Sequence, residues 1–347
     1  MPALIATDEY SARLRARAIK IPERRLLIAK LSGSEQEQDL KEPPNCDGFG
    51  RIRHFHRNRH TDNWPTNPLP IDPAIRALGL PPSESLNAQV FQNAACNWRC
   101  WYCFVPFNML DAKPESGAWL TPDELVSLYL AEPSDKRARM IDLTGGQPDL
   151  VPEWVPWTME SLRERGLEGR VFLWSDDNLS TDYYWRFLDN RQQELVSSFK
   201  GYGRVGCFKG FDDESFSFNT QAHPELFQRQ FELFERMLKS GVDLYAYTTF
   251  TATNVAGIGD KVARFVDRLQ AIDENLPLRT VPLQVHRLKV LDARLDAHQR
   301  YHELGKIPFE AQQRAIEAWC YELEKRFSSD MRERRITEVP MGLRKSE

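Results

Sequence analysis

The chain has 347 residues, of which 41% are hydrophobic and 28% are charged, as in ordinary soluble globular proteins. Its formal net charge of −4 excludes the strongly basic surface of a general nucleic-acid binder. No run of about 18 apolar residues is present, so no membrane-spanning helix is predicted. The chain also lacks the long apolar stretch of a secretory signal, so we expect a cytoplasmic protein with reduced thiols.

Residues 1–85 are predicted to form an irregular N-terminal extension. Prolines in KEPPN, NWPTNPLPIDP and LPPSES interrupt this segment and exclude long regular elements there. Residues 1–60 carry twelve Lys or Arg and eight Asp or Glu, so this end of the chain is basic and the remainder is acidic. A basic segment of this kind either meets an anionic ligand or is simply a solvated surface.

Alternating arginines mark the stretch GRIRHFHRNRH within this extension. If the stretch is extended, one face presents Phe55 together with a set of arginines: Arg51, Arg53, Arg57 and Arg59. Arginine binds phosphate and carboxylate through its planar fork. The functional hypothesis is that this segment closes over the mouth of the core and grips an anionic substrate group. The alternative is a basic surface exposed to solvent.

Short apolar segments follow from residue 86 onward, and we interpret them as largely buried strands. They are residues 88–94, 139–144, 170–174, 204–208, 243–250 and 281–290. Helical patterns lie between them. One of these, TPDELVSLYLAE, has Thr121 as a candidate N-cap, Pro122 at the first helical position and Glu124 three residues after the cap. A strand–helix repeat of about 30–40 residues implies parallel strands with right-handed crossovers.

The number of repeats limits the architecture. Six strand–helix units are too few for a closed eight-stranded barrel, and they suit an open partial barrel or a doubly wound sheet. Both architectures place their chemistry at the carboxyl ends of the strands. Residues 291–347 include PFEAQQRAIEAWCYELEKRF and are predicted to form a helical C-terminal extension.

Three of the six cysteines lie within eight residues of QNAACNWRCWYCFVPFNML, directly after the first predicted strand: Cys96, Cys100 and Cys103. In a reducing compartment such a cluster indicates metal binding or catalysis rather than disulfides. A structural zinc site and a [4Fe–4S] cluster each offer four ligand positions. Either a distant residue supplies the fourth ligand, or one iron stays open to bind another molecule.

The stretch CNWRCWYC resembles the C-x3-C-x-aromatic-C motif of the radical S-adenosylmethionine superfamily, with Tyr102 at the aromatic position. In that family three cysteines hold a [4Fe–4S] cluster, and the fourth iron chelates S-adenosylmethionine. Reductive cleavage of this cofactor gives a 5′-deoxyadenosyl radical, which takes a hydrogen atom from the substrate. The resemblance implies Cys96, Cys100 and Cys103 as cluster ligands. It also implies an electron donor such as a flavodoxin or a ferredoxin.

A second resemblance lies at the end of the second predicted strand, in DLTGGQPDL. Gly145, Gly146, Gln147 and Pro148 are similar to the Gly-Gly-acidic-Pro sequence of the family, whose main chain receives the methionyl amino group of the cofactor. Glycine suits this role because a backbone without a β-carbon can approach a ligand closely. Gln147 replaces the usual glutamate, which puts any carboxylate role in doubt. The alternative is an ordinary strand–helix turn.

Polar residues at the later strand ends are the remaining cofactor contacts that the resemblance implies. Those selected are Ser175, Asp176, Asn178, Lys209 and Thr249. Lys209 lies in FKG, which is similar to the lysine–glycine strand ends of glycyl-radical activating enzymes. Polar strand ends are common in any α/β fold, which is the alternative interpretation of each.

The resulting prediction is an α/β protein with a partial (βα)6 TIM-like barrel over residues 86–290, flanked by the irregular N-terminal and helical C-terminal segments. It is expected to be a radical S-adenosylmethionine enzyme that acts on a small-molecule or peptide substrate with an anionic group. The alternative is a non-catalytic zinc or Fe–S binding or sensing module. Its fourth ligand would be Cys46 or one of the histidines in residues 54–60, namely His54, His56 and His60.

Overall fold

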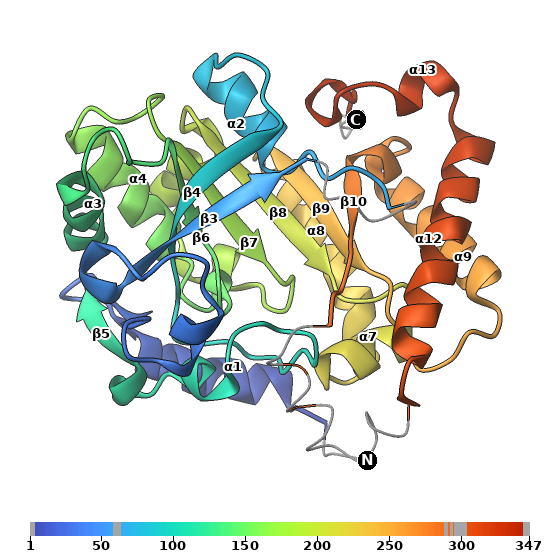
Figure 1. The fold of residues 1–347 in the computed structure, drawn as a ribbon, viewed down its shortest axis with the longest axis horizontal. Coiled ribbons are helices and arrows are strands. Elements are labelled where there is room, and N and C mark those ends of the chain that lie inside the picture. Colours follow the sequence, from blue (N-terminus) through green and yellow to red (C-terminus); the bar gives the residue numbers. More distant parts are fainter. Residues whose placement is uncertain (1–3, 58–63, 288–290, 292–293, 295–303, 343–347) are drawn as a thin grey trace.

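The computed structural model describes residues 4–57, 64–287, 291, 294 and 304–342. A curled seven-stranded sheet forms its centre, and most helices pack on the outer face of this sheet (Figure 1). The strands are β3 (Gly50–His56), β4 (Ser85–Phe91), β6 (Met140–Leu143), β7 (Phe172–Asp177), β8 (Tyr202–Phe208), β9 (Leu244–Thr249) and β10 (Thr280–Leu283). Their order across the sheet is β10-β9-β8-β7-β6-β4-β3.

Six of these strands, β4 to β10, are parallel and lie side by side in chain order. A doubly wound sheet would reverse its strand order at one point. The sequential order therefore confirms the partial (βα)6 barrel, and it brings all six carboxyl ends to one edge. The last predicted strand, residues 281–290, is shorter than expected, because β10 ends at Leu283 and residues 288–290 lie outside the described residues.

The crossover helices follow the predicted pattern. They are α3 (Pro122–Ala131), α4 (Trp154–Glu164), α5 (Tyr183–Phe187), α6 (Asn190–Ser198), α7 (Asp213–Thr220), α8 (Leu226–Lys239) and α9 (Ile258–Ile272). At the start of α3, Glu124 N donates to Thr121 Oγ1 over 3.1 Å and Thr121 N donates to Glu124 Oε2 over 2.7 Å. This capping box confirms the predicted helix start.

The sheet separates two apolar layers because side chains alternate between its faces. Outward side chains such as Leu173 and Phe208 pack with the helices in the larger core. Inward side chains such as Phe55, Trp174 and Tyr245 form a second cluster inside the half-barrel. Charged residues that share the inward face with this second cluster are therefore available to a ligand in the barrel.

The prediction that residues 1–85 are irregular is wrong, because helices and strands form within this segment. This segment contains α1 (Thr7–Ala18), β2 (Arg25–Ala29), the strand β3 and α2 (Ile71–Leu78). β2 pairs with β1 (Ile19–Lys20) and β5 (Gly117–Leu120) in a small antiparallel sheet, while β3 pairs along its whole length with β4. The prolines lie between these elements or in the first turn of α2, where a missing N–H breaks no helical hydrogen bond.

The C-terminal flank is helical, as predicted, over α12 (Ile307–Arg326) and α13 (Ser329–Arg332), and α12 packs beside α9 (Figure 1). Parts of residues 291–347 lie outside the described residues. Short 3-10 turns complete the chain: η1 (Glu35–Asp39), η2 (Cys46–Gly48), η3 (Phe107–Leu110), η4 (Pro114–Ser116), η5 (Pro148–Leu150), η6 (Leu276–Arg279) and η7 (Ile336–Glu338). Within the described ranges, no helix combines the length and the apolar character needed to cross a bilayer.

Candidate functional site

The cysteine loop lies at the carboxyl edge of the sheet because it follows β4 directly. Its backbone is anchored at several points. Cys96 N donates to Leu110 O over 3.0 Å, and Cys103 N donates to Cys100 O over 2.9 Å. Between them, Trp101 N donates to Asn219 O at the end of α7 over 3.2 Å. The loop is thus fixed by its own hydrogen bonds and by α7.

Side chains from later parts of the chain also hold this loop. Trp101 Nε1 donates to Asn219 Oδ1 over 2.9 Å, and Asn219 Nδ2 donates to Lys209 O over 2.8 Å. Arg294 donates to Cys103 O and, over 2.6 Å, to Val105 O. Asn219 therefore links the cysteine loop to the end of β8, where Lys209 lies.

The three loop cysteines form one electrostatic group. Cys100 is buried, while Cys96 and Cys103 are partly buried, and all three are free thiols. Burial raises the pKa of Cys100 to about 12, while the ammonium of Lys209 lowers it, and Cys96 and Cys103 raise it further. A positive charge beside these thiols favours the thiolate form that a metal needs.

The donor set fits an iron–sulfur cluster better than one metal ion. Among the residues that the structure describes, no three His, Cys, Asp or Glu side chains converge closely enough to hold a single ion. Zinc requires such convergence. The three thiolates of a [4Fe–4S] cluster bind three different irons, so they need not point at one centre.

Cys46 does not belong to this group. Its backbone N–H donates to Glu132 Oε1 over 2.9 Å, and burial and Glu132 raise the pKa of its thiol to about 12. His54 is hydrogen-bonded instead to Asn87 Oδ1 over 2.7 Å and to Glu42 Oε1 over 2.5 Å. Cys46 and His54, two of the residues proposed as a fourth zinc ligand, therefore lie in separate environments. His60 and Arg59 lie outside the described residues.

The Gly145–Pro148 loop packs directly on the start of the cysteine loop. Gly146 has a φ of +67°, and a β-carbon there would lie 2.4 Å from Ala95 O and 2.5 Å from Asn93 O. Gln147 N donates to Ala95 O over 2.7 Å, and Asn93 Nδ2 donates to Gln147 O over 2.9 Å. Glycine is therefore required here by close backbone contact between the two loops.

The Gln147 side chain is buried and uses both ends of its amide. Its Nε2 donates to Asp177 Oδ1 over 2.8 Å, and its Oε1 accepts from Asn178 N over 3.0 Å. A glutamate at this position could accept from Asn178 but could not donate to Asp177. The local hydrogen bonds thus explain why glutamine replaces the acidic residue of the family motif in this chain.

We expect Gln147→Glu to lower the free energy of unfolding by about 1–3 kcal/mol at pH 7, because it places an unpaired carboxylate against Asp177. The loss should shrink as the pH falls toward 5 and the introduced, buried carboxyl takes up a proton. Urea unfolding at both pH values measures this effect. Gln192→Glu is the matched control, since Gln192 Oε1 accepts from Asp189 N in a capping box and a glutamate accepts equally well. Equal stabilities of the two variants would contradict this role of Gln147.

Three predicted cofactor contacts come together beside the cysteines. Tyr102 Oη lies 3.2 Å from Thr249 Oγ1 at the end of β9, so the loop and the fifth parallel strand are hydrogen-bonded. Lys209 lies in the same electrostatic group as Tyr102 and Cys100. Asp176 also faces inward, where its Oδ2 accepts from Thr144 Oγ1 over 2.5 Å.

Ser175 and Asn178, the other two predicted cofactor contacts at strand ends, differ from this group in their surroundings. Ser175 points to the opposite face of β7, where its hydroxyl lies 2.7 Å from Tyr202 Oη and is buried. The structure therefore does not bring Ser175 to the inward group. Asn178 lies just beyond β7 and donates through Nδ2 to Asn97 Oδ1 over 3.0 Å, while its own Oδ1 has no hydrogen-bond partner in the described part of the chain.

Sequence reasoning did not select Asp142 of β6, which is fully buried on the inward face. Its signal in the sequence is one acidic residue at the centre of the apolar strand RMIDLT. Arg53 Nη1 lies 3.5 Å from Asp142 Oδ2, and Arg51 and Phe55 share the inward face of β3 with Arg53. The predicted common face of Arg51, Arg53 and Phe55 is confirmed.

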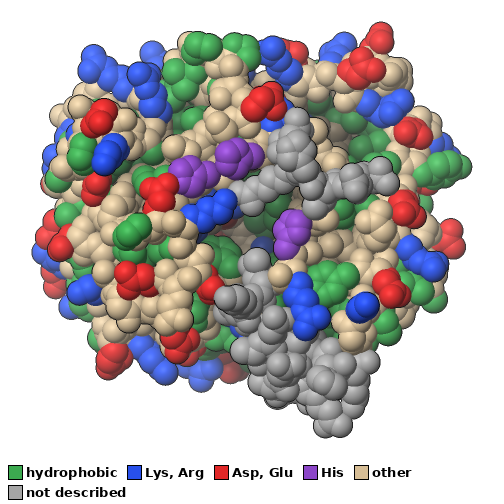
Figure 2. Space-filling view, in the orientation of Figure 1, with side chains coloured by type: hydrophobic (Ala, Val, Ile, Leu, Met, Phe, Trp, Pro, Cys, Tyr) green, Lys and Arg blue, Asp and Glu red, His purple; other side chains and the backbone are tan. Residues whose placement is uncertain are grey.

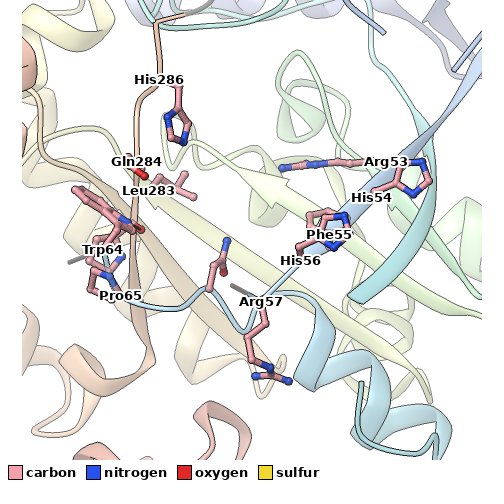
Figure 3. Close-up of a pocket in the computed structure, with 12 residues that line it drawn as sticks. Arg53, His54, Phe55, His56, Arg57, Trp64, Pro65, Leu283, Gln284 and His286 are labelled. Atoms are coloured by element: carbon pink, nitrogen blue, oxygen red, sulfur yellow. Dashed lines mark hydrogen bonds between the residues drawn. The ribbon is translucent and has the colours of Figure 1, made fainter. Parts of the chain in front are cut away.

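A pocket of about 220 Å³ lies between the two edge strands of the half-barrel. Arg53 and Phe55 of β3 line one side, and Leu283 and His286, at the end of β10 and just beyond it, line the other (Figure 3). On this face of the molecule, histidine side chains gather near Lys or Arg side chains (Figure 2). The pocket is therefore basic and leads toward the inward face of the sheet.

No protein-family model matches this chain, and no curated protein matches it. Solved structures do. Streptococcus suis SuiB bound to its precursor peptide SuiA matches 53% of this chain and 36% of its own, at 15% identity and a TM-score of 0.38. TYW1 with a lysine–pyruvate adduct matches 64% and 73%, at 12% identity and a TM-score of 0.39.

A third match is the radical S-adenosylmethionine methyltransferase TsrM from Kitasatospora setae, with cobalamin and a [4Fe–4S] cluster bound. It matches 62% of this chain and 39% of its own, at 13% identity and a TM-score of 0.37. This chain thus spans about a third of SuiB. Because these TM-scores and identities are low, the proposals that follow rest on the residues of this chain.

Proposed function

We propose that this chain is a radical S-adenosylmethionine enzyme. The observation that carries the proposal is the meeting of three features at the carboxyl edge of an open parallel barrel. These are the C-x3-C-x2-C loop after β4, the Gly145–Pro148 loop that packs on it, and the inward polar ends of β8 and β9. This edge is where parallel barrels place their chemistry.

The residues that would hold the cofactors are assigned by position. Cys96, Cys100 and Cys103 would bind the [4Fe–4S] cluster. S-adenosylmethionine would lie beside them, against the backbone of Gly145–Pro148 and near Tyr102. When bound, the cluster would supply the electron that cleaves S-adenosylmethionine to a 5′-deoxyadenosyl radical, which takes a hydrogen atom from the substrate.

The protein itself has to orient the reactants and exclude water. Trp98 and Trp101 of the cysteine loop are almost fully buried and pack against Phe216 and Phe218 of α7, so these aromatic contacts help to exclude water where the loop meets α7. The Tyr102–Thr249 hydrogen bond fixes the aromatic residue of the motif against β9. Lys209 supplies a positive charge that offsets the thiolates.

We expect anaerobic reconstitution with iron and sulfide to load about four irons and four sulfides per chain. Replacing the three loop cysteines with alanine should reduce this content to background, because it removes all three thiols proposed as cluster ligands. Cys46→Ala is the matched control and should keep the wild-type content, since Cys46 lies beside Glu132 and is not one of the three loop cysteines. Elemental analysis measures the iron and sulfide content, and calorimetric titration measures the binding of S-adenosylmethionine.

The same samples decide between the proposal and the zinc-module alternative. One zinc and no iron in the wild type, lost in Cys46→Ala, would overturn the enzyme assignment. A full cluster that binds S-adenosylmethionine only when the loop cysteines are present would support it.

A further inference from the structure

Two buried charges on the inward face of the sheet lie near the proposed cofactor site but have no role assigned in it, and the guanidinium of Arg51 lies 5.2 Å from the ring centroid of Phe104 in the cysteine loop. Arg51 of β3 is 7% exposed and Asp142 of β6 is fully buried. Strand pairing places Arg51 opposite Val90 and Val90 opposite Asp142, so the three residues form one row across β3, β4 and β6. The two charges flank a small apolar side chain, about 10 Å apart at the backbone, which is two strand spacings.

Neither charged group has its hydrogen bonds satisfied within the described part of the chain. Arg51 Nε and Nη2 and both carboxylate oxygens of Asp142 are buried there without a hydrogen-bond partner. The Arg53–Asp142 contact of 3.5 Å is longer than an ordinary hydrogen bond. Buried charges are costly unless they are paired and hydrogen-bonded. Arg53 therefore offsets the charge of Asp142 only in part, and hydrogen-bonding capacity of both Arg51 and Asp142 stays unused in the described residues.

The titration of the two groups agrees with this geometry. Burial raises the pKa of Asp142 to about 8, with Asp176 adding to the effect and Arg53 and Arg51 opposing it. Burial lowers the pKa of Arg51 to about 10, with Arg53 adding and Asp142 and Asp176 opposing. Both shifts disfavour the charged forms, and a ligand that brings the opposite charge to each group would reverse them.

The pocket between the edge strands lies beside the row, although Arg51, Val90 and Asp142 do not line it. Arg53 joins the two, because it forms part of the pocket wall (Figure 3) and its Nη1 lies 3.5 Å from Asp142 Oδ2. The pocket volume of about 220 Å³ is smaller than the roughly 300–1,000 Å³ of pockets for drug-sized ligands. The pocket therefore suits a small polar group.

We propose that the row Arg51–Val90–Asp142 anchors the substrate of the proposed enzyme, and that this substrate is a small zwitterion with an oxyanion and a protonated nitrogen. The oxyanion, a carboxylate or a phosphate, accepts hydrogen bonds from the Arg51 fork. The protonated nitrogen donates to Asp142. Arg53 in the pocket wall attracts the oxyanion on entry. The substrate role rests on the proposed function, whereas binding at the row does not require the cluster.

Ligand-observed NMR titration of the full chain without iron tests this inference. The probes are β-alanine and O-phosphoethanolamine, which carry both groups, and propionate and ethylamine, which carry one each. We expect at least one zwitterion to bind about tenfold or more tightly than either single-charge probe, because only a zwitterion can form charged hydrogen bonds with both Arg51 and Asp142. The tighter zwitterion identifies the oxyanion as carboxylate or phosphate.

Arg51→Met and Asp142→Asn should each weaken binding of that zwitterion by about tenfold or more. Arg165→Met is the control, since Arg165 pairs with Asp123 on the outer surface. Asp142→Asn is nearly isosteric, so it keeps the test valid even if Arg51→Met fails to fold. Unchanged affinities in the folded variants, or no binding by the wild type, would overturn the inference.

A competition experiment with the reconstituted chain separates this site from the cofactor site. Saturating S-adenosylmethionine should leave the bound zwitterion in place. Displacement would assign the row to the cofactor and overturn the inference, while the proposed function would stand. Conversely, zwitterion binding in a chain that takes up no iron would leave the row intact as a binding site and remove the enzyme assignment.

Discussion

Replacing Arg204 with methionine is expected to lower the free energy of unfolding by about 3–5 kcal/mol at pH 7. Arg204 lies on β8 and is almost fully buried, where it pairs with Asp149 and, over 2.8 Å, with Asp177. Asp177 in turn accepts from Gln147, so this ion pair supports the loop that packs on the cysteines. Methionine removes the cation and leaves two carboxylates buried and unpaired.

The loss should depend on pH in a defined direction. Burial raises the pKa of Asp149 to about 7 even with Arg204 beside it. Without the cation, Asp149 should bind a proton still more readily in the folded chain than in the unfolded chain, so the deficit should shrink as the pH falls from 7 toward 5. Denaturant unfolding at several pH values measures this. Arg163→Met, which breaks the exposed pair with Glu168, should cost less than about 1 kcal/mol. A similarly small effect of Arg204→Met would contradict the supporting role of the buried pair.

Replacing Gly146 with alanine is expected to lower the free energy of unfolding by about 2–5 kcal/mol, since left-handed strain of about 1–2 kcal/mol adds to a backbone collision. The colliding atoms are Ala95 O and Asn93 O, which belong to the main chain before Cys96 and cannot rotate away. Relief of the collision must shift the cysteine loop. Iron uptake after reconstitution should therefore fall well below the wild-type level.

The variant Gly166→Ala separates the backbone strain from the collision with the cysteine loop. Gly166 has the same φ of +67°, but a β-carbon there would meet nothing within 4 Å. This variant should lose only the strain contribution, about 1–2 kcal/mol, and should keep full iron uptake. Equal losses of stability and iron in both variants would contradict the close packing of the two loops.

The sequence predicts those features that depend on neighbouring residues. The α3 capping box follows from Thr121 and Glu124, and the six parallel strands follow from apolar segments of suitable spacing. The sequence predicts the arginine face of β3 but not its place in the core sheet, because the pairing of β3 with β4 joins residues as far apart as Gly50 and Phe91. Long-range pairing of this kind has no local signal.

The sequence also does not predict which side chains of a strand face the barrel interior. Ser175 and Asp176 are adjacent on β7, and a strand directs them to opposite faces, so only one of them can face the barrel interior. The register of β7 with β6 and β8 decides which of the two faces inward. The sequence does contain a signal for Asp142, since an acidic residue within an apolar buried strand must find a partner or a function. Buried polar residues in predicted strands are therefore worth selecting as site candidates.

The most direct test of the central claim is the formation of 5′-deoxyadenosine by the reconstituted chain with S-adenosylmethionine and a strong reductant, assayed by chromatography under anaerobic conditions. The wild type should form it, and the variant with Cys96, Cys100 and Cys103 replaced by alanine should not. A wild-type chain that carries a full cluster, binds S-adenosylmethionine and still forms no 5′-deoxyadenosine, even with a zwitterion that binds at the Arg51–Asp142 row, would contradict the account.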